Sequence, residues 1–245
     1  MKRQHSAFAF CLLPFALLST ASCSQSPPAD PGIITIAVRS GPNTLDPRLS
    51  NDEATQRMAQ LVYGALLDHT DDLRIRPSLA VRLDKPDPLT YIAHLRHGVA
   101  FHDGHELTSR DVVYTFKSIL DPALPSPFKG AFRALKDVTA LDDHTVVFTL
   151  SEPFAAFPMQ LTGVPPIVPD SAGDSLRTFP IGTGPYRFVR YEADDTLVLT
   201  AFEGFWEGAP KNTGITMKVV PDDTMRGLEL RKGTTDLVVN DLPPD

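Results

Sequence analysis

A strand–helix–strand pattern near the end of the chain restricts the fold more than any other feature. Residues 215–220 are rich in apolar and β-branched side chains and predict a strand. Residues 224–232 predict a helix that ends at Gly233, and residues 235–240 predict a second strand. The pattern has the form of a right-handed βαβ unit. It therefore predicts a sheet that contains parallel strands.

The rest of the chain mixes strands and helices. One helix is predicted to start at residues 51–53, because Asn51 is followed by acidic residues and by apolar residues at helical spacing up to Leu66. A second helix is predicted to start at Thr108, which with Asp111 resembles a capping box. Strands are predicted at 33–38 and 89–95 and in two hairpins, 137–141 with 145–150 and 186–191 with 196–202. The fold class is therefore α/β or α+β.

Composition excludes several classes of protein. The chain has 23 prolines in 245 residues, which argues against a helical bundle. It has 30 acidic and 23 basic residues, and the net charge of -7 argues against a nucleic-acid-binding protein. Cys11 and Cys23 are the only cysteines, so neither a disulfide-stapled scaffold nor a four-cysteine zinc site is possible.

Residues 1–22 have the order of a secretory signal peptide. Lys2 and Arg3 precede a short apolar run at 7–18, and small residues follow at 19–22. The run is shorter than the ~20 residues of a membrane span, and no later segment is longer. Residues 18–23 resemble a bacterial lipobox, which predicts a lipid on Cys23. The alternative is an ordinary signal peptide with a chance cysteine.

Cleavage before Cys23 would leave 245 − 22 = 223 residues with a net charge of -7 − 2 = -9. Residues 23–32 are polar and proline-rich, which predicts a flexible tether behind the lipid anchor. These features predict a membrane-anchored lipoprotein of the periplasm or cell envelope.

Two motifs invite a chemical interpretation. His102, Asp103, His105 and Glu106 are residue types that zinc accepts. The histidines are three apart with Asp103-Gly104 between them, however, which favours a polar turn over a helical zinc site. Residues 182–185, Gly-Thr-Gly-Pro, lack the lysine of a phosphate-binding loop. We therefore predict neither catalytic residues nor a cofactor nor a metal.

Several segments together resemble the solute-binding proteins of bacterial oligopeptide and dipeptide ABC importers, family 5. Residues 95–116 carry the longest similarity, with matches at Phe101, Asp103, Gly104, Leu107, Thr108, Asp111 and Val112. Shorter similarities lie at 40–47, 62–67, 182–186 and 205–210. The resemblance runs from about residue 33 to residue 245. His102 and His105 fall at variable positions of this signature, which again indicates a turn.

The resemblance implies a type II periplasmic-binding-protein fold whose two lobes close on the ligand. Residues 33–240 would form the first lobe, a mixed sheet with hairpins and helices, with an inserted subdomain at about 56–178. Family members are about twice this long, so the second lobe would lie beyond residue 245 and residues 241–245 would begin the crossover to it. Because half of the cleft would then be absent, residues 24–245 alone should not bind peptide tightly. The chain is thus expected to be an N-terminal fragment.

The implied function is to bind peptides and deliver them to a membrane permease. Ligand contacts are expected from two loops and one tryptophan: Ser40, Gly41, Pro42, Asn43, Thr44, Gly184 and Trp206. Structural packing is the alternative for Trp206, and a purely structural turn is the alternative for the loop at 40–44. Other functions left open are binding of nickel, haem or another solute, a sensing lipoprotein without an importer, and a secreted zinc hydrolase that uses His102, His105 and an acid.

Overall fold

The structure is a computed structural model that describes residues 32–163 and 166–239. The predicted signal peptide at 1–22, the lipidated Cys23, all of the tether except Gly32, and the crossover at 241–245 lie outside the described residues. Within the described part, no helix is long and apolar enough to cross a membrane.

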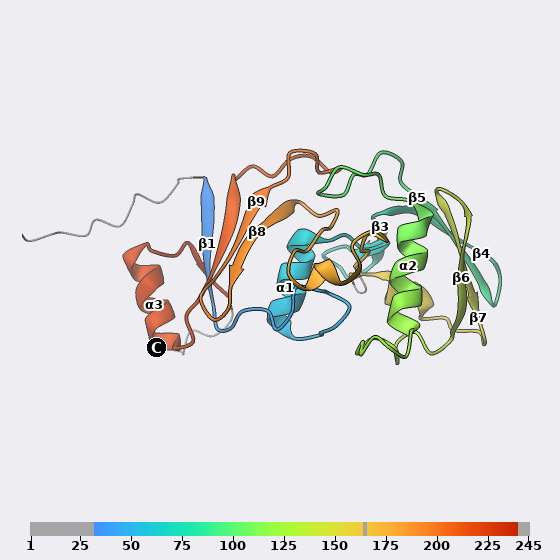
Figure 1. Cartoon of the computed structure of the whole chain (residues 1–245), viewed down its shortest axis with the longest axis horizontal. Coiled ribbons are helices and arrows are strands. Elements are labelled where there is room, and N and C mark those ends of the chain that lie inside the picture. Colours follow the sequence, from blue (N-terminus) through green and yellow to red (C-terminus); the bar gives the residue numbers. More distant parts are fainter. Residues whose placement is uncertain (1–31, 164–165, 240–245) are drawn as a thin grey trace, which may run out of the picture. The chain divides into compact units, whose positions relative to one another are not determined.

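A five-stranded sheet forms one half of the fold (Figure 1). Its order is β11 (Leu237–Val238), β1 (Ile33–Val38), β10 (Gly214–Val219), β9 (Thr196–Ala201) and β8 (Tyr186–Glu192). β1 pairs in parallel with both β10 and β11, and the other pairs are antiparallel. The predicted strand–helix–strand unit is therefore β10, α3 (Asp223–Lys232) and β11, with β1 lying between its two strands.

Helix α1 (Glu53–Val62) packs on this sheet through Met58, Ala59 and Val62. Its N-cap is Asp52, whose carboxylate accepts a hydrogen bond from the Thr55 N–H at 2.9 Å. The predicted continuation of the helix to Leu66 is wrong. Tyr63 has extended backbone, and from Gly64 onward the chain pairs with other segments, so Leu66 and Leu67 enter the next core instead.

The second half of the fold is a four-stranded antiparallel sheet covered by α2 (Ser109–Leu120). The sheet order is β4 (Ala80–Asp87), β5 (Thr90–Leu95), β7 (Thr145–Leu150) and β6 (Leu135–Asp142). The predicted cap of α2 is confirmed, because the Asp111 carboxylate accepts hydrogen bonds from the backbone N–H and the hydroxyl of Thr108. Gly233 ends α3 with a φ of 71°, as its position predicts.

Several short elements escaped sequence analysis. They are β2 (Leu67–His69), β3 (Ile75–Pro77), β4, and two 3₁₀ helices at Phe157–Leu161 and Gly173–Arg177. β4 is an edge strand with register shifts, and it contains Asp84, Lys85 and Pro86, which are poor strand formers. Its pairing with β5 outweighs that local preference.

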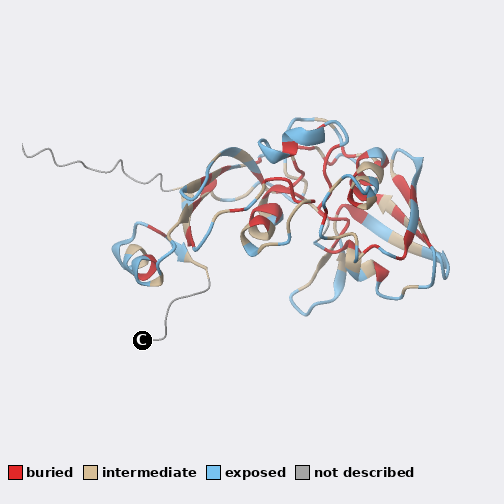
Figure 2. Ribbon diagram, turned by 60° about the horizontal axis from the view of Figure 1, so that its bottom comes forward, coloured by how far each residue is buried: buried red, intermediate tan, exposed pale blue. Residues whose placement is uncertain are grey.

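Two hydrophobic clusters fill the interior, one for each large sheet (Figure 2). One lies between the four-stranded sheet and α2 and is rich in phenylalanine, including Phe116, Phe132 and Phe148 in edge-to-face contact. The other lies between the five-stranded sheet and α1. The prediction of an inserted subdomain at about 56–178 remains a prediction.

Candidate functional site

The carboxyl ends of β1, β10 and β11 meet at one edge of the five-stranded sheet, because these three strands are parallel. From β1 the chain leaves this edge towards α1, and from β10 it leaves towards α3. In open α/β sheets, a crevice outside the carboxyl ends of strands whose connections diverge is the usual ligand site. This edge is therefore a candidate ligand site.

A pocket of about 170 Å³ lies at that edge, and we call it the carboxyl-edge pocket. One part of its lining, which we call the wall, comes from the sheet and from Val239 just after β11, and the other part, which we call the mouth, comes from the loop after β1 and the N-terminal half of α1. The lining residues of the wall are Val38, Tyr191, Leu197, Met217, Val219 and Val239, and those of the mouth are Arg39, Ser40, Gly41, Pro42, Glu53, Ala54 and Arg57. The lining from the sheet is thus mostly apolar, and the charged side chains of the lining come from the loop after β1 and from α1.

The loop after β1 is held in place by Tyr191. The Tyr191 hydroxyl donates a hydrogen bond to the Pro42 carbonyl at 2.9 Å. Gly41 lies so close to this side chain that a Cβ at residue 41 would be 2.4 Å from the hydroxyl oxygen. Burial raises the pKa of Tyr191, and the negative charge of Asp194 adds to the effect, so the phenol stays protonated as a donor.

Among the predicted site residues, Ser40, Gly41 and Pro42 line the carboxyl-edge pocket, whereas Asn43 and Thr44 do not. Thr44 has a local structural role. Its hydroxyl accepts a hydrogen bond from the Asp46 N–H at 3.2 Å, and its carbonyl accepts one from the Thr55 hydroxyl at 3.4 Å. These bonds fasten the loop to the start of α1.

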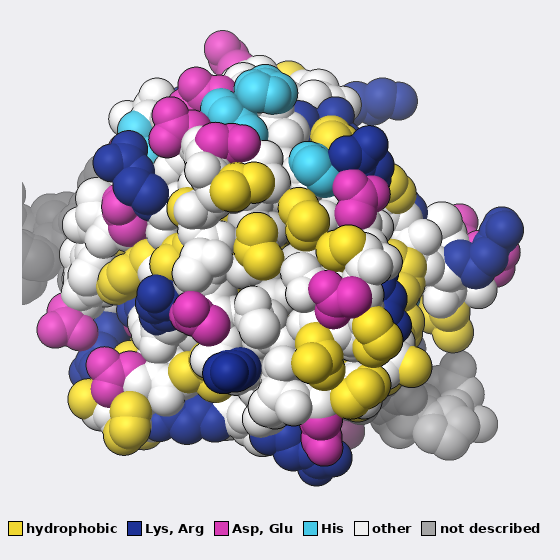
Figure 3. All heavy atoms as spheres, turned by 90° about the vertical axis from the view of Figure 1, so that its right-hand side faces the viewer, with side chains coloured by type: hydrophobic (Ala, Val, Ile, Leu, Met, Phe, Trp, Pro, Cys, Tyr) yellow, Lys and Arg dark blue, Asp and Glu magenta, His cyan; other side chains and the backbone are white. Residues whose placement is uncertain are grey.

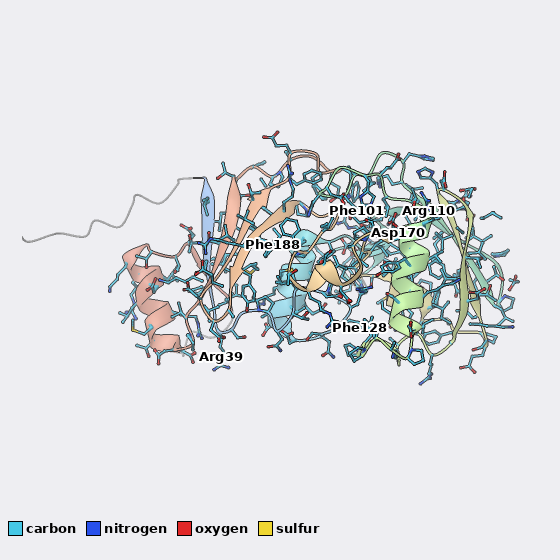
Figure 4. All side chains as sticks on the ribbon, viewed as in Figure 1. Arg39, Phe101, Arg110, Phe128, Asp170 and Phe188 are labelled. Atoms are coloured by element: carbon cyan, nitrogen blue, oxygen red, sulfur yellow. The ribbon has the colours of Figure 1, made fainter. Side chains whose placement is uncertain are left out.

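The charged side chains at the mouth differ in how they are paired. Arg57 forms an ion pair with Glu53 one turn away on α1. Arg39 is more exposed, at 65%, and its nearest carboxylate is that of Asp223 at 3.9 Å, beyond hydrogen-bond distance. Figure 4 shows Arg39 at the lower edge of the sheet, next to α3. Its guanidinium is therefore the cation at the mouth with the most freedom to bind a solute.

Gly184 and Trp206, the other predicted site residues, line a different pocket of about 410 Å³. The carboxyl-edge pocket is lined by the first residues of α1, whereas this second pocket is lined by two residues of its last turn, Ala59 and Gln60. The structure therefore does not bring the two groups of predicted residues together.

Packing against neighbouring segments accounts for the positions of Gly184 and Trp206. A Cβ on Gly182 would lie 2.1 Å from the Val62 carbonyl oxygen, and one on Gly184 would lie 2.6 Å from the Val62 carbonyl carbon. The two glycines thus allow their loop to close against the end of α1. The ring of Trp206 is covered by the Arg96 guanidinium, 4.3 Å from the ring centroid.

His102 has a structural role that uses both of its ring nitrogens. Nε2 bonds to the Gly184 carbonyl at 2.9 Å, and Nδ1 accepts from the Gly182 N–H at 3.4 Å. Burial lowers the pKa of His102 to about 4, although the Gly184 carbonyl opposes that shift, so the ring is neutral. A role as a zinc ligand would require one of these bonds to break.

Two further histidines, His105 and His144, pair with acidic side chains. His105 Nδ1 bonds to Asp103 at 2.6 Å, and His144 Nε2 lies 3.5 Å from Glu106. Figure 3 shows histidine and acidic side chains next to one another at the upper edge of the face that it draws. Among the described residues, no group of three histidine, cysteine or acidic side chains could hold a metal ion.

Sequence analysis missed Arg39, Glu53, Arg57 and Tyr191 as lining residues of the carboxyl-edge pocket. Arg39 directly follows the first predicted strand, so its place at a strand end was a usable signal. Tyr191 comes from β8, which is separated from β1 by two strands in the sheet, and no local pattern indicates that its hydroxyl reaches the Pro42 carbonyl.

The mixed sheet with its carboxyl-edge pocket defines a type II periplasmic-binding-protein fold. The chain belongs to the bacterial extracellular solute-binding proteins, family 5, whose middle-region model matches residues 74–245. Two relatives support this assignment. Protein XP55 of Streptomyces lividans is 35% identical over 86% of this chain, and the glutathione-binding protein GsiB of Pectobacterium atrosepticum is 33% identical over 87% of it.

Solved structures give the same result. The mannopinic acid complex of MoaA from A. tumefaciens R10 superposes with a TM-score of 0.81 at 25% identity, over 86% of this chain and 45% of that one. The oligopeptide-binding protein AppA of Bacillus subtilis, in complex with a nonapeptide, superposes with a TM-score of 0.78 at 27% identity, over 83% and 43%. The chain spans 39% of the length of Protein XP55 and 43% of that of GsiB.

Proposed function

We propose that this chain is part of the substrate-binding component of an ABC-type importer, which binds peptides outside the cytoplasmic membrane and passes them to a membrane permease. The observation that carries the proposal is the carboxyl-edge pocket in a chain of a solute-binding family. The protein would bind its solute and release it unchanged, without turnover.

Peptides are the proposed solute because the similar proteins include binders of a nonapeptide and of glutathione, itself a small peptide. An extended peptide offers backbone donors and acceptors at every residue, so a site that bonds to its main chain accepts many sequences. The loop at Ser40, Gly41 and Pro42 has the backbone groups for such bonding. Contacts at Asn43, Thr44, Gly184 and Trp206, which do not line the carboxyl-edge pocket, stay a prediction from the sequence and are not part of this proposal.

Localisation is proposed from the first residues of the chain. A lipid on Cys23 would hold the protein at the membrane, and the polar tether at 23–32 would let the folded part reach both solute and permease. Metabolic labelling with a fatty-acid probe tests the anchor. We expect the label on the wild type and its loss in Cys23→Ala.

The function is tested by native mass spectrometry of the full-length protein, mixed with an equimolar pool of dipeptides to nonapeptides. We expect one peptide per protein molecule, retained over many sequences. Retention of a sugar acid, with no peptide retained from the pool, would replace peptides by another solute class. Failure to retain any solute would contradict the proposal.

A further inference from the structure

The lining of the carboxyl-edge pocket has two chemically different parts, and together they restrict what the pocket can hold. Five residues of the wall are aliphatic or methionine side chains: Val38, Leu197, Met217, Val219 and Val239. An apolar group placed there gains about 25 cal/mol for each Å² that it removes from water. The occupant of the wall side is therefore an apolar group rather than a hydrated one.

The mouth offers hydrogen-bond donors that the protein does not use. Ser40 and Gly41 follow the last paired residue of β1, and within the described residues their backbone N–H groups donate to no acceptor. Asp223, the nearest carboxylate to Arg39, is already bonded to the guanidinium of Arg226. Arg39 therefore remains available to an acceptor from outside the chain.

The second arginine at the mouth does not have this freedom. The Arg57 guanidinium is bound by the Glu53 carboxylate, and its side chain is 24% exposed, against 65% for Arg39. The donors available to a solute thus gather on three successive residues, Arg39, Ser40 and Gly41. A carboxylate suits such a group, because it only accepts hydrogen bonds and pairs with a guanidinium through two oxygens.

On the basis of the proposed function, we propose that the solute carries an apolar side chain next to a free carboxylate. The apolar side chain occupies the pocket, and the carboxylate binds Arg39 and the N–H groups of Ser40 and Gly41. A short peptide with an apolar C-terminal residue has this chemistry. Arg39 is then the residue that selects a free C-terminus over a blocked one.

The test is titration calorimetry of the full-length protein with three probes: the tripeptide Ala-Ala-Leu, its C-terminal amide, and Ala-Ala-Gly. For the wild type we expect the amide to bind at least about tenfold more weakly than the free acid, since it loses a charge-assisted contact. We expect Ala-Ala-Gly to bind about tenfold more weakly than Ala-Ala-Leu, since it leaves the apolar wall empty.

Arg39→Gln should weaken binding of Ala-Ala-Leu about tenfold and should abolish the preference for the acid over the amide. The matched control is Arg82→Gln, because Arg82 is 63% exposed and ion-paired with Asp84 on the other sheet, away from the pocket. The control should bind all three probes as the wild type does. Both variants should keep the wild-type melting temperature, which shows that neither acts through unfolding.

The possible results distinguish a failure of the role proposed for Arg39 from a failure of the proposed function. Equal affinity of the wild type for the acid and the amide, or unchanged affinity of Arg39→Gln, would overturn the role of Arg39 and leave peptide binding intact. Failure of every probe and of every peptide in the mixed pool to bind would overturn the proposed function, and this solute class with it.

Discussion

The Arg48 guanidinium forms a two-pronged ion pair with the Asp46 carboxylate inside the protein. Nε lies 3.0 Å from one carboxylate oxygen and an Nη lies 2.7 Å from the other, and the side chains are 3% and 1% exposed. The other Nη donates to the Tyr114 hydroxyl at 3.2 Å and to the Ser118 hydroxyl at 3.0 Å. This pair thus joins the loop after β1 to α2.

Asp46→Asn tests whether this pair holds the fold together. Burial alone would lower the pKa of Arg48, but the hydrogen bond and charge of Asp46 outweigh it and raise the pKa, so the guanidinium stays charged. Removal of its partner leaves a buried charge, and we expect a loss of about 3–5 kcal/mol in the free energy of unfolding, measured by urea denaturation.

The matched control for that variant is Asp72→Asn, which removes the partner of Arg74 in an exposed pair with side chains 58% and 79% accessible. Exposed pairs contribute about 0–1 kcal/mol. Equal losses in the two variants would show that burial of the Asp46–Arg48 pair is unimportant.

His102 should make the protein less stable in mild acid. Its pKa is about 4 in the fold and about 6.5 when unfolded, so the unfolded chain binds the extra proton between these values. Its contribution to stability is complete above pH 6.5 and is lost as the pH falls towards 4. Between pH 6.5 and 5 we expect a loss of about 1.5 kcal/mol.

His102→Gln should remove that pH dependence, which urea denaturation at a series of pH values measures. His97→Gln is the control, because His97 is exposed and stacks on His144 rather than bonding within the Gly182 loop. A wild-type slope between pH 6.5 and 5 in His102→Gln would contradict this role of His102.

Gly182→Ala tests the packing role of the Gly-Thr-Gly-Pro segment. The new Cβ would lie 2.1 Å from a backbone oxygen of Val62, so the loop or α1 must move. We expect a loss of about 1–3 kcal/mol in thermal denaturation. Gly130→Ala is the control, since a Cβ there meets nothing within 4 Å, and its effect should stay within about 0.5 kcal/mol. Similar effects of the two substitutions would contradict the packing role.

Much of the fold could be predicted from local patterns. The capping pair Thr108 and Asp111, the left-handed Gly233 and the β-branched run of β1 each act within a few residues, and each lies where the sequence places it. The early end of α1 could not be predicted, because Leu66 keeps the helical spacing while its burial comes from the other hydrophobic cluster.

The site was only partly predictable, for the same physical reason. Ser40, Gly41 and Pro42 follow a strand, so their place at a sheet edge follows from the sequence. Gly184 and Trp206 were grouped with them, yet they line a pocket at the other end of α1. Nothing in the sequence fixes which end of α1 a distant loop approaches, because that depends on tertiary packing.

Tyr191→Phe tests the anchor of the site loop. Loss of the hydrogen bond to the Pro42 carbonyl should cost about 1 kcal/mol in stability and, because the loop is then less ordered, about fivefold in affinity for Ala-Ala-Leu by calorimetry. Tyr186→Phe is a matched control that removes a hydroxyl bonded to Asn212 at 2.6 Å, away from the pocket. It should lower stability by a similar amount and leave affinity unchanged; equal affinity losses in both variants would argue against a specific role for Tyr191.

The most direct test of the central claim is an NMR titration of the full-length protein, labelled with ¹⁵N on glycine and tryptophan, with Ala-Ala-Leu. The Gly41 amide reports on the carboxyl-edge pocket and the Trp206 indole N–H reports on the second pocket. Our account predicts that the Gly41 resonance moves in proportion to bound peptide while the Trp206 indole stays in place. Movement of the Trp206 indole with Gly41 unchanged would contradict the account and place the solute at the other end of α1.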